Sequence, residues 1–378
     1  MSRRAPAGGA APAGATPSIV ANGWRPVIRG RSAFRITGPL PAGAIADCDP
    51  REVRMSADGL AIEVRNLTKT YPDGVRALDG VTFEVPTGTV FGLLGPNGAG
   101  KSTTIKILTT LARPDSGRAR VAGRDVVAEP ARVRRAIGYV AQQSGCDPAD
   151  TGRENLMLQG RLYGLGGRAL RERADGLLER FGLTDVADRL VKTYSGGMRR
   201  KLDVAMGLVH EPRVLFLDEP TTGLDPEARV ALWREIGAMA RAGITVVLTT
   251  HYLEEADELA DALAILDRGT VVAQGSPEGL KKALQGDSVQ VQLTEPAESR
   301  TVKHALADVG GVHDIVVSGR EVRARVDAGA SSAPAVLSAL ESADLRVASV
   351  TLSAPTLDEV YLRHTGRSFR SAQEGDIT

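Results

Sequence analysis

The chain has 378 residues, enough for two domains, and its formal net charge of +1 gives no reason to expect nucleic acid or an anionic membrane surface as a partner. Its two cysteines, Cys48 and Cys146, lie far apart in sequence and cannot build a secreted disulfide framework, which favours a reducing cytoplasm. All apolar runs are far shorter than the ~18 residues of a membrane span, so we expect a soluble chain that does any membrane work through a partner.

Residues 1 to about 55 are rich in Ala, Gly, Pro and Arg and show no periodicity. Such a segment buries too little apolar surface to offset the entropy of ordering it, so we predict disorder over residues 1–55. It also lacks the apolar core, of roughly 7 to 15 residues, that a secretory signal needs. Met55 opens the sequence MSADGLAIEVR and resembles a natural start, in which case the first 54 residues are an upstream extension or result from a misassigned start.

Two segments with alternating apolar and polar residues follow. They are AIEVRNLTKTY, which begins at Ala61, and RALDGVTFEVP, and the alternation is typical of strands in an antiparallel edge sheet. Tyr71 lies in the loop between them, and its aromatic face could stack on a flat heterocycle such as adenine. A tyrosine at a strand end more often packs into a core, and only its nearness to the next motif favours a binding role.

The segment GPNGAGKST satisfies the phosphate-binding pattern G-x-x-x-x-G-K-[ST]. A short apolar run precedes it, and a helical pattern follows from Ile105, as the motif requires. The glycines allow successive N–H groups to point at the β and γ phosphates of a nucleotide, while Lys101 adds charge and Ser102 offers a hydroxyl to Mg²⁺. We therefore expect nucleotide binding. The residues of this segment are Gly95, Pro96, Asn97, Gly98, Ala99, Gly100, Lys101, Ser102 and Thr103.

A turn-rich stretch, RPDSGRARVAGRDV, separates this helix from the short strand IGYVAQ, which ends at Gln142. A polar residue at the end of a strand in an α/β sheet lies near the carboxyl edge, where ligands bind. Gln142 could therefore reach Mg²⁺ or the γ phosphate, and Gln143, which follows directly, is the competing candidate.

Residues from about 150 to 192 carry apolar side chains at helical spacing, which predicts a helical insertion in the α/β domain. The next helix begins after Ser195, Gly196 and Gly197. A hydroxyl and bare backbone amides at a helix N-terminus can bind a second anion, although serine is also a common N-cap residue.

The apolar segment VLFL is typical of a strand in a parallel sheet, and it delivers Asp218 and Glu219 to the carboxyl edge. One carboxylate can hold hydrated Mg²⁺ while the next orients and deprotonates a water molecule. A further apolar strand, in TVVLTTH, ends at His251, which is another polar side chain directed at the same edge.

From about residue 287 the pattern reads strand, helix, strand, strand, helix, strand, followed by TLDEVYLRHTG. This order is the split arrangement of a small α+β ferredoxin-like domain. We predict such an accessory domain over residues 287–365 and a flexible tail over residues 366–378. The accessory domain has no catalytic constellation, so a regulatory or dimer-supporting role is the default.

Taken together, the motifs resemble those of an ABC-type ATP-binding subunit. GPNGAGKST, Gln142, YSGGM, VLFLDEP, GLD and His251 match its Walker A, Q-loop, signature, Walker B, D-loop and H-loop in order and spacing. The resemblance covers about residues 60–285 and implies an α/β P-loop NTPase core with an antiparallel β subdomain and a helical subdomain. TGRENL, KTYSGGMRRKLDVA, LFLDEPTTGLDP and LDEVYLRHTG further resemble the daunorubicin-resistance type of exporter ATPase.

The resemblance implies a role for each residue that matches a family motif. Lys101 would bind the β and γ phosphates of ATP, and Ser102 and Asp218 would hold Mg²⁺. Glu219 would be the general base. Gln142 would contact the Mg²⁺ and sense the γ phosphate.

His251 would also contact the γ phosphate, and Tyr71 would stack on adenine. The Ser-Gly-Gly sequence at 195–197 would close on the ATP held by an opposite subunit, with Asp225 helping to form that interface. The family's signature commonly continues with glutamine, where this chain has Met198. The resemblance therefore implies no side-chain contact from that position, while the phosphate-facing serine and glycines remain.

The resemblance also implies partners and a place in the cell. Two copies would sandwich two ATP molecules and drive a separate membrane permease, for drug or antibiotic efflux, from the cytoplasmic face of the cell membrane. Two non-transport classes of the superfamily are alternatives. DNA-maintenance ATPases insert a long coiled coil between the P-loop and the signature, and the interval from Lys101 to Ser195 is too short for one. Ribosome-associated factors normally carry two cassettes in one chain, and this sequence contains one.

Overall fold

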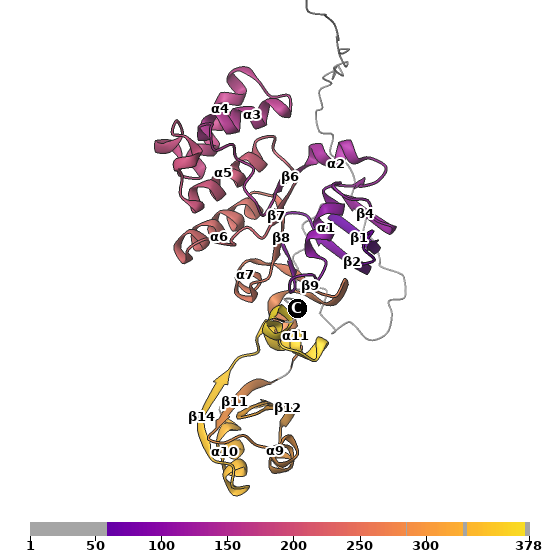
Figure 1. Cartoon of the computed structure of the whole chain (residues 1–378), viewed down its shortest axis with the longest axis vertical. Helices are drawn as coiled ribbons and strands as arrows, with labels where there is room; N and C mark the ends of the chain where they lie inside the picture. The colour runs from indigo at the N-terminus through magenta and orange to yellow at the C-terminus, as the bar shows by residue number, and fades with distance from the viewer. Residues whose placement is uncertain (1–58, 285, 328–330, 375–378) are drawn as a thin grey trace, which may run out of the picture. The chain divides into compact units, whose positions relative to one another are not determined.

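The computed structural model describes residues 59–284, 286–327 and 331–374 (Figure 1). The predicted disorder of residues 1–55 lies outside this part of the chain. The described residues form three sheets with helices packed on them.

The first sheet is antiparallel, in the order β2-β1-β4-β5. Its first two strands are the alternating segments predicted from the sequence. The stretch predicted to be turn-rich contains the other two strands, and that prediction is wrong there. Only Ala119 and Val121 are apolar and buried in β4, so pairing with β1, which joins Ile62 to Val121, decides its conformation. The strands are β1 (Leu60–Thr70), β2 (Arg76–Pro86), β4 (Ser116–Val121) and β5 (Arg124–Asp125).

The second sheet has six strands in the order β10-β9-β3-β8-β7-β6, of which only β10 runs antiparallel to its neighbour. Its central strands consist of buried, mostly apolar residues because helices cover both faces of such a sheet. The carboxyl ends of β3, β7 and β8 therefore share one edge. The strands are β3 (Val90–Leu94), β6 (Ile137–Val140), β7 (Val214–Asp218), β8 (Thr245–Thr250), β9 (Ala262–Asp267) and β10 (Thr270–Gly275).

Helices connect the strands of this core. The helix after the phosphate-binding segment begins at Lys101, four residues before the predicted helical pattern, because Gly100 takes a left-handed backbone that turns the loop into the helix. The helix that precedes β6 has no counterpart in the sequence prediction. The helices are α1 (Lys101–Leu108), α2 (Pro130–Ala136), α5 (Gly196–Leu208), α6 (Pro226–Arg241), α7 (Leu253–Leu259) and α8 (Pro277–Lys282).

The helical insertion lies where the apolar spacing predicted helices. Its first helix starts with a capping box, in which Thr151 and Glu154 satisfy each other's backbone N–H groups. The apolar stripe of the second helix is buried, from Leu170 to Leu178, and Phe181 follows it into the same core cluster. The elements are α3 (Gly152–Leu162), α4 (Gly167–Arg180) and the 3-10 helices η1 (Thr184–Val186) and η2 (Val191–Thr193).

The third sheet is antiparallel with the order β12-β13-β11-β14, and two helices complete the predicted β-α-β-β-α-β fold. Its hydrophobic core consists only of residues of this sheet and its helices, with Val291, Leu306 and Leu340 among the fully buried side chains. The elements are β11 (Asp287–Leu293), α9 (Ser299–Leu306), β12 (Val312–Ser318), β13 (Glu321–Val326), α10 (Ala333–Ser342) and β14 (Val347–Ser353).

Two helices, α11 (Leu357–Thr365) and α12 (Phe369–Glu374), follow the third sheet. The prediction of a flexible tail over 366–378 is wrong for α12, whose Phe369 and Ala372 are buried with Tyr361 of α11. Their cluster includes Ile265 of β9, so both helices pack on the α/β core. Two apolar side chains three residues apart on one helix face suffice for this packing, although the segment as a whole is polar. Residues 375–378 lie outside the described part.

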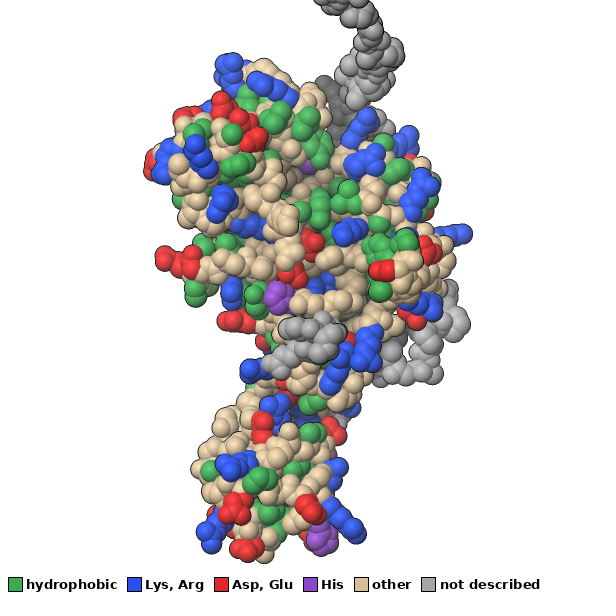
Figure 2. All heavy atoms as spheres, viewed as in Figure 1, with side chains coloured by type: hydrophobic (Ala, Val, Ile, Leu, Met, Phe, Trp, Pro, Cys, Tyr) green, Lys and Arg blue, Asp and Glu red, His purple; other side chains and the backbone are tan. Residues whose placement is uncertain are grey.

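Within the described residues, no helix combines the length and the apolar character that a membrane span requires. Figure 2 shows acidic and basic side chains interspersed over the visible face, which agrees with the net charge of +1.

Candidate nucleotide-binding site

The loop from β3 to α1 passes so close to neighbouring backbone that two of its positions have no room for a side chain. A Cβ atom at Gly95 would lie 2.5 Å from the carbonyl oxygen of Leu266, and one at Gly100 would lie 2.6 Å from that of Ala77. Gly100 also has φ +103°, in the region that favours glycine. The tip of the loop, at Asn97 and Gly98, is exposed.

The loop leads into the first turn of α1, whose N–H groups have no helical carbonyl four residues earlier. These are the amides of Lys101, Ser102 and Thr103, and the helix dipole places partial positive charge at the same point. The arrangement has the chemistry of a phosphate cradle.

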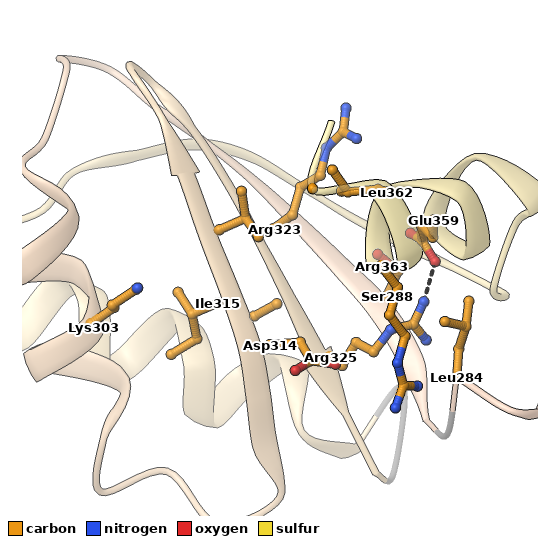
Figure 3. A pocket seen from close by; sticks show the side chains of 13 residues that line it. Leu284, Ser288, Lys303, Asp314, Ile315, Arg323, Arg325, Glu359, Leu362 and Arg363 are labelled. Carbon is orange, nitrogen blue, oxygen red and sulfur yellow. Dashed lines mark hydrogen bonds and ion pairs between the residues drawn. The ribbon is translucent and has the colours of Figure 1, made fainter. Parts of the chain in front are cut away.

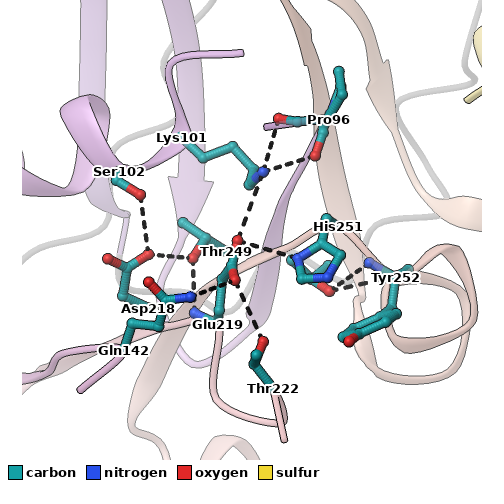
Figure 4. Close-up of polar contacts among 12 residues, drawn as sticks. Pro96, Lys101, Ser102, Gln142, Asp218, Glu219, Thr222, Thr249, His251 and Tyr252 are labelled. Atoms are coloured by element: carbon teal, nitrogen blue, oxygen red, sulfur yellow. Dashed lines mark hydrogen bonds and ion pairs between the residues drawn. The ribbon is translucent and has the colours of Figure 1, made fainter. Parts of the chain in front are cut away.

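Lys101 is buried, and its Nζ donates to the carbonyl oxygens of Gly95 (2.7 Å) and Pro96 (2.9 Å), as Figure 4 shows. Burial lowers the pKa of Lys101, whereas the nearby carboxylates of Glu219 and Asp218 act in the opposite direction. Nζ lies 3.8 Å from Oε1 of Glu219. The amine is thus held over the loop, beside the carboxyl edge of the sheet.

Asp218 ends β7, and two hydroxyls donate to its Oδ1. These belong to Thr249, at 2.6 Å, and to Ser102, at 3.5 Å. Carboxylate and hydroxyl oxygens are hard ligands that suit Mg²⁺, so the residues predicted to hold the metal fit it. Thr249 also accepts the backbone N–H of Glu219 at 2.9 Å, so one hydroxyl bridges the two acidic residues. The sequence analysis missed Thr249. What marks this residue is its position opposite Asp218 on the neighbouring strand, which the sequence does not reveal.

Glu219 lies at the centre of a polar network (Figure 4). Its Oε2 accepts from Nε2 of Gln142 (3.0 Å) and from Oγ1 of Thr222 (3.3 Å), and its Oε1 lies 3.1 Å from Nδ1 of His251. The contact with His251 lowers the pKa of Glu219 below its usual range, with help from the charge of Lys101 and against the effect of burial. The carboxylate is therefore ionised and oriented from three sides.

The backbone of Glu219 has φ +45°, a left-handed conformation that costs a non-glycine residue about 1 to 3 kcal/mol. This strain aims the side chain away from the course of β7, toward Gln142 and His251. The hydrogen bond from its N–H to Thr249 helps to hold it.

Gln142 and not Gln143 reaches the carboxylate. The strand predicted to end at Gln142 ends at Val140, and Gln142 lies two residues beyond it. Among the described residues, Gln143 has no hydrogen bond or ion pair. The structure therefore places Gln142, and not Gln143, beside Glu219.

Arg200 of α5 is a second residue that the sequence analysis missed. Its buried guanidinium donates to the carbonyl oxygens of Ala141 (2.6 Å), Pro220 (2.8 Å) and Asp218 (3.0 Å). It thus joins the segment that carries Gln142 to the end of β7. An arginine in the run MRRK has no pattern that distinguishes it from its solvated neighbours.

Tyr71 lies against the first turn of α1, with its hydroxyl 3.4 Å from Oγ1 of Thr103. Its ring is only partly buried, and Nζ of Lys69 lies 5.8 Å from the ring centroid. The tyrosine is therefore beside the loop, with ring surface still available.

The remaining predicted residues lie at two other helix starts. Ser195 caps α5 by accepting from Met198 N–H (3.2 Å), and Asp225 caps α6 by accepting from Ala228 N–H (2.8 Å). In the described chain, no hydrogen bond or ion pair joins residues 195–197 or Asp225 to the loop 95–103.

Two protein families match this chain. Residues 78–222 match the ABC transporter family, and residues 275–365 match the C-terminal domain of DrrA1-3-like ATP-binding proteins. The first match contains the phosphate loop and both acidic residues, and the second contains the third sheet and α11.

The chain is also similar to curated proteins over most of its length. It is 47% identical to the daunorubicin resistance ATP-binding protein DrrA2 of Streptomyces coeruleorubidus over 310 residues, which are 82% of this chain and 96% of that protein. It is 43% identical to the doxorubicin resistance ATP-binding protein DrrA of Mycobacterium tuberculosis over 318 residues, 82% of this chain and 95% of that protein.

Solved structures resemble the α/β core. One is the ATP-binding subunit of an ABC transporter, with TM-score 0.54 and 32% identity, over 60% of this chain and 93% of that one. Another is a dimeric ATP-binding cassette in a post-hydrolysis state with ADP and phosphate, with TM-score 0.53 and 27% identity, over 57% of this chain and 98% of that one.

Proposed function

This chain belongs to the family of ABC transporter ATP-binding proteins, and we propose that it is the ATP-hydrolysing subunit that powers drug or antibiotic efflux through a separate membrane permease. The observation that carries the proposal is the network around Glu219, in which Gln142, His251 and Thr222 orient one ionised carboxylate beside a phosphate cradle. The similar proteins from Streptomyces and Mycobacterium are named for resistance to daunorubicin and doxorubicin. The chain would act at the cytoplasmic face of the membrane, held there by the permease.

The residues of the site have separable roles. ATP would place its phosphates on the amides of the loop and of α1, with Lys101 on the β and γ phosphates and adenine on Tyr71. Mg²⁺, when bound by Ser102 and Asp218 with Gln142 as a further contact, supplies positive charge to the phosphate oxygens. Glu219 would orient the attacking water and accept its proton.

Lys101 and His251 also set the strength of that base. Without phosphate, both hold the pKa of Glu219 low, which keeps it ionised but makes it a weak proton acceptor. Phosphate oxygens that engage Lys101 would compete with Glu219 for its charge and raise the pKa of Glu219, whereas Mg²⁺ on the adjacent Asp218 would lower it. The balance of these two effects would set the base strength of Glu219 when the nucleotide is bound.

We propose a homodimer because, within the described residues, no hydrogen bond or ion pair joins the Ser-Gly-Gly sequence at 195–197 to the phosphate loop of its own chain. Gly196 has open space around it, so its backbone can approach a ligand closely. A second copy would bring this helix N-terminus to the γ phosphate and complete the site. A dimeric arrangement of a related cassette with ADP and phosphate supports this proposal.

The test is Glu219→Gln, which keeps the shape of the side chain and removes the base. We expect ATP binding to persist and turnover to fall by about 10²- to 10⁴-fold, measured by steady-state phosphate release. The matched control is Glu254→Gln, an exposed glutamate of α7. ATP should convert the Glu219→Gln variant to a dimer in size-exclusion chromatography. Turnover at the wild-type rate in this variant would remove Glu219 from the base role.

A further inference from the structure

The cavity between the third sheet and α11 does not select a ligand by its charge (Figure 3). Its volume is about 620 Å³, but Arg325 is paired with Glu359 and Arg323 with Glu321. Two buried charged side chains of α5 are arranged differently, because their hydrogen bonds reach segments of the nucleotide site.

Asp203 of α5 is a buried carboxylate whose donors come from one short segment. Its Oδ1 accepts from the hydroxyl of Ser144 (3.0 Å), the N–H of Gly145 (2.9 Å) and the thiol of Cys146 (3.1 Å). The thiol is neutral, because burial and the charge of Asp203 raise the pKa of Cys146 to about 12. Oδ2 has no partner in the described chain, so these three residues satisfy a charge that burial makes costly.

Arg200 lies three residues before Asp203, on the same face of α5. Its buried guanidinium donates to the carbonyl oxygen of Ala141 and to those of Asp218 and Pro220, on either side of the proposed base. Each of the two charged side chains is therefore bonded to the chain around the nucleotide site.

Gln142 lies between the two points that α5 fixes. The guanidinium holds Ala141 and the carboxylate holds Ser144, so two residues separate these points. The side chain of Gln142 is exposed, yet its amide donates to Glu219 at 3.0 Å. Because packing restrains an exposed side chain very little, the backbone on both sides of Gln142 must set its position.

We propose that Asp203 and Arg200 are positioning residues for Gln142. They hold the backbone on both sides of it and thereby keep its amide against the carboxylate of Glu219. The inference rests on the proposed ATPase function, in which Gln142 contacts Mg²⁺ and the γ phosphate. If Asp203 served only the stability of the fold, the effect of its loss would not depend on the side chain at position 142.

The first test is a pair of substitutions in the full chain, made separately and together. Asp203→Ala removes the acceptor of three hydrogen bonds and should lower kcat for ATP by about ten- to hundredfold. The KM for ATP should change by less than about threefold, because the phosphate loop and Tyr71 are untouched. In a Gln142→Ala background, Asp203→Ala should lower kcat by less than about threefold, because the side chain that it positions is gone.

Three further variants serve as controls. Asp203→Asn keeps the shape and one oxygen acceptor, so its kcat should lie between those of Asp203→Ala and the wild type. Ser144→Ala combined with Cys146→Ala removes two donors and leaves both buried charges in place. It should lower kcat by about three- to tenfold, and it tests the same contact if thermal melts show that Asp203→Ala does not fold. Asp185→Ala removes an exposed carboxylate of η1 that has no hydrogen bond or ion pair in the described chain, and should leave kcat unchanged.

Hydrogen exchange of the nucleotide-free chain measures the contact without turnover. The N–H of Gly145 should exchange at least about tenfold faster in Asp203→Ala than in the wild type, and at the wild-type rate in Asp185→Ala. Wild-type exchange at Gly145 in Asp203→Ala would show that the carboxylate does not hold the segment. Wild-type kcat in folded Asp203→Ala, or an equal loss of kcat with and without the Gln142 side chain, would overturn the positioning role. Absence of ATP turnover in the wild type would instead overturn the proposed function, which the exchange measurement does not involve.

Discussion

Thr249 connects the two acidic residues of the nucleotide site. Its hydroxyl donates to Asp218 and accepts from the backbone of Glu219, whose φ of +45° is strained. The hydroxyl therefore supports a carboxylate that would hold Mg²⁺ and the conformation of the residue that would accept a proton. A side chain without a direct ligand role can thus set the geometry of both.

Thr249→Val keeps the shape of the side chain and removes this bridge. The partly buried N–H of Glu219 then lacks an acceptor, so we expect the free energy of unfolding to fall by about 1 to 3 kcal/mol. Turnover should fall as well because Glu219 is less well oriented. Urea denaturation and phosphate release measure the two effects, and Thr249→Ser should restore both. Wild-type turnover in the valine variant would show that the bridge has no part in catalysis.

At the scale of elements, α11 is attached to the α/β core through a buried side chain. Tyr361 is fully buried and donates to Asp267, while its ring meets Phe369 of α12 edge-on at 5.0 Å between centroids. Burial, together with the hydrogen bond to Asp267, raises the pKa of Tyr361 to about 12. The neutral phenol is therefore the form that the fold stabilises.

The raised pKa predicts how stability depends on alkaline pH. The contribution of the neutral phenol is fully present below the ordinary tyrosine pKa of 10.0 and is lost as the pH rises through about 12. Tyr361→Phe should lower the free energy of unfolding by about 1 to 2 kcal/mol at neutral pH. Its further loss between pH 10.0 and about 12 should be smaller than that of the wild type.

Chemical denaturation at a series of pH values measures this difference. Tyr252→Phe is the matched control, because the hydroxyl of Tyr252 has no hydrogen bond within the described residues. Parallel alkaline loss in Tyr361→Phe and wild type would contradict the assignment of the transition to Tyr361.

The boundaries between the hydrophobic clusters differ from the domain boundaries predicted from the sequence. The third sheet and its helices share one cluster, whereas α11 and α12 belong to a cluster with β9 and α7. The accessory domain predicted over 287–365 therefore has a core that is complete before α11.

Residues 286–354 should fold alone and give a dispersed amide NMR spectrum. A fragment 286–378 should show additional signals in the random-coil region from α11 and α12, and a collapsed spectrum of the shorter fragment would contradict the division.

At the scale of the assembly, the segment from Ser144 to Asp150 joins Gln142 to the helical insertion. It is mostly exposed, and Asp203 of α5 accepts the hydroxyl of Ser144 (3.0 Å) and the N–H of Gly145 (2.9 Å). Movement of Gln142 when two subunits close on ATP would therefore be passed to α3 and α5 as a rigid-body shift. A docked permease helix could follow that shift.

Ala149→Arg places a large charged side chain on this exposed segment. We expect ATP turnover of the isolated subunit to be unchanged, while co-purification with the permease and drug export both fall. Ala169→Arg makes the same substitution on the exposed face of α4 and is the control. Wild-type association and export in Ala149→Arg would place the coupling surface elsewhere.

The parts of the site that are contiguous in the chain could be predicted from the amino-acid sequence alone. The loop from Gly95 to Thr103 and the pair Asp218 and Glu219 were predicted because backbone geometry and strand ends are local properties of a short segment. The fully apolar strands and the β-α-β-β-α-β order of the third sheet were predicted for the same reason, since period and length are visible without knowledge of partners.

Features that depend on partners distant in sequence became visible in the folded chain. Thr249 reaches Asp218 because β8 lies beside β7 in the sheet. Arg200 donates to three carbonyl groups that come from two other segments of the chain. Gln142 rather than Gln143 lies beside Glu219 because of the position that Glu219 takes in the fold. The strand β4 and the helix α12 have few apolar residues of their own, so packing against other segments stabilises them. Such contacts are set by the free energy of the whole fold, and no local pattern in the chain records them.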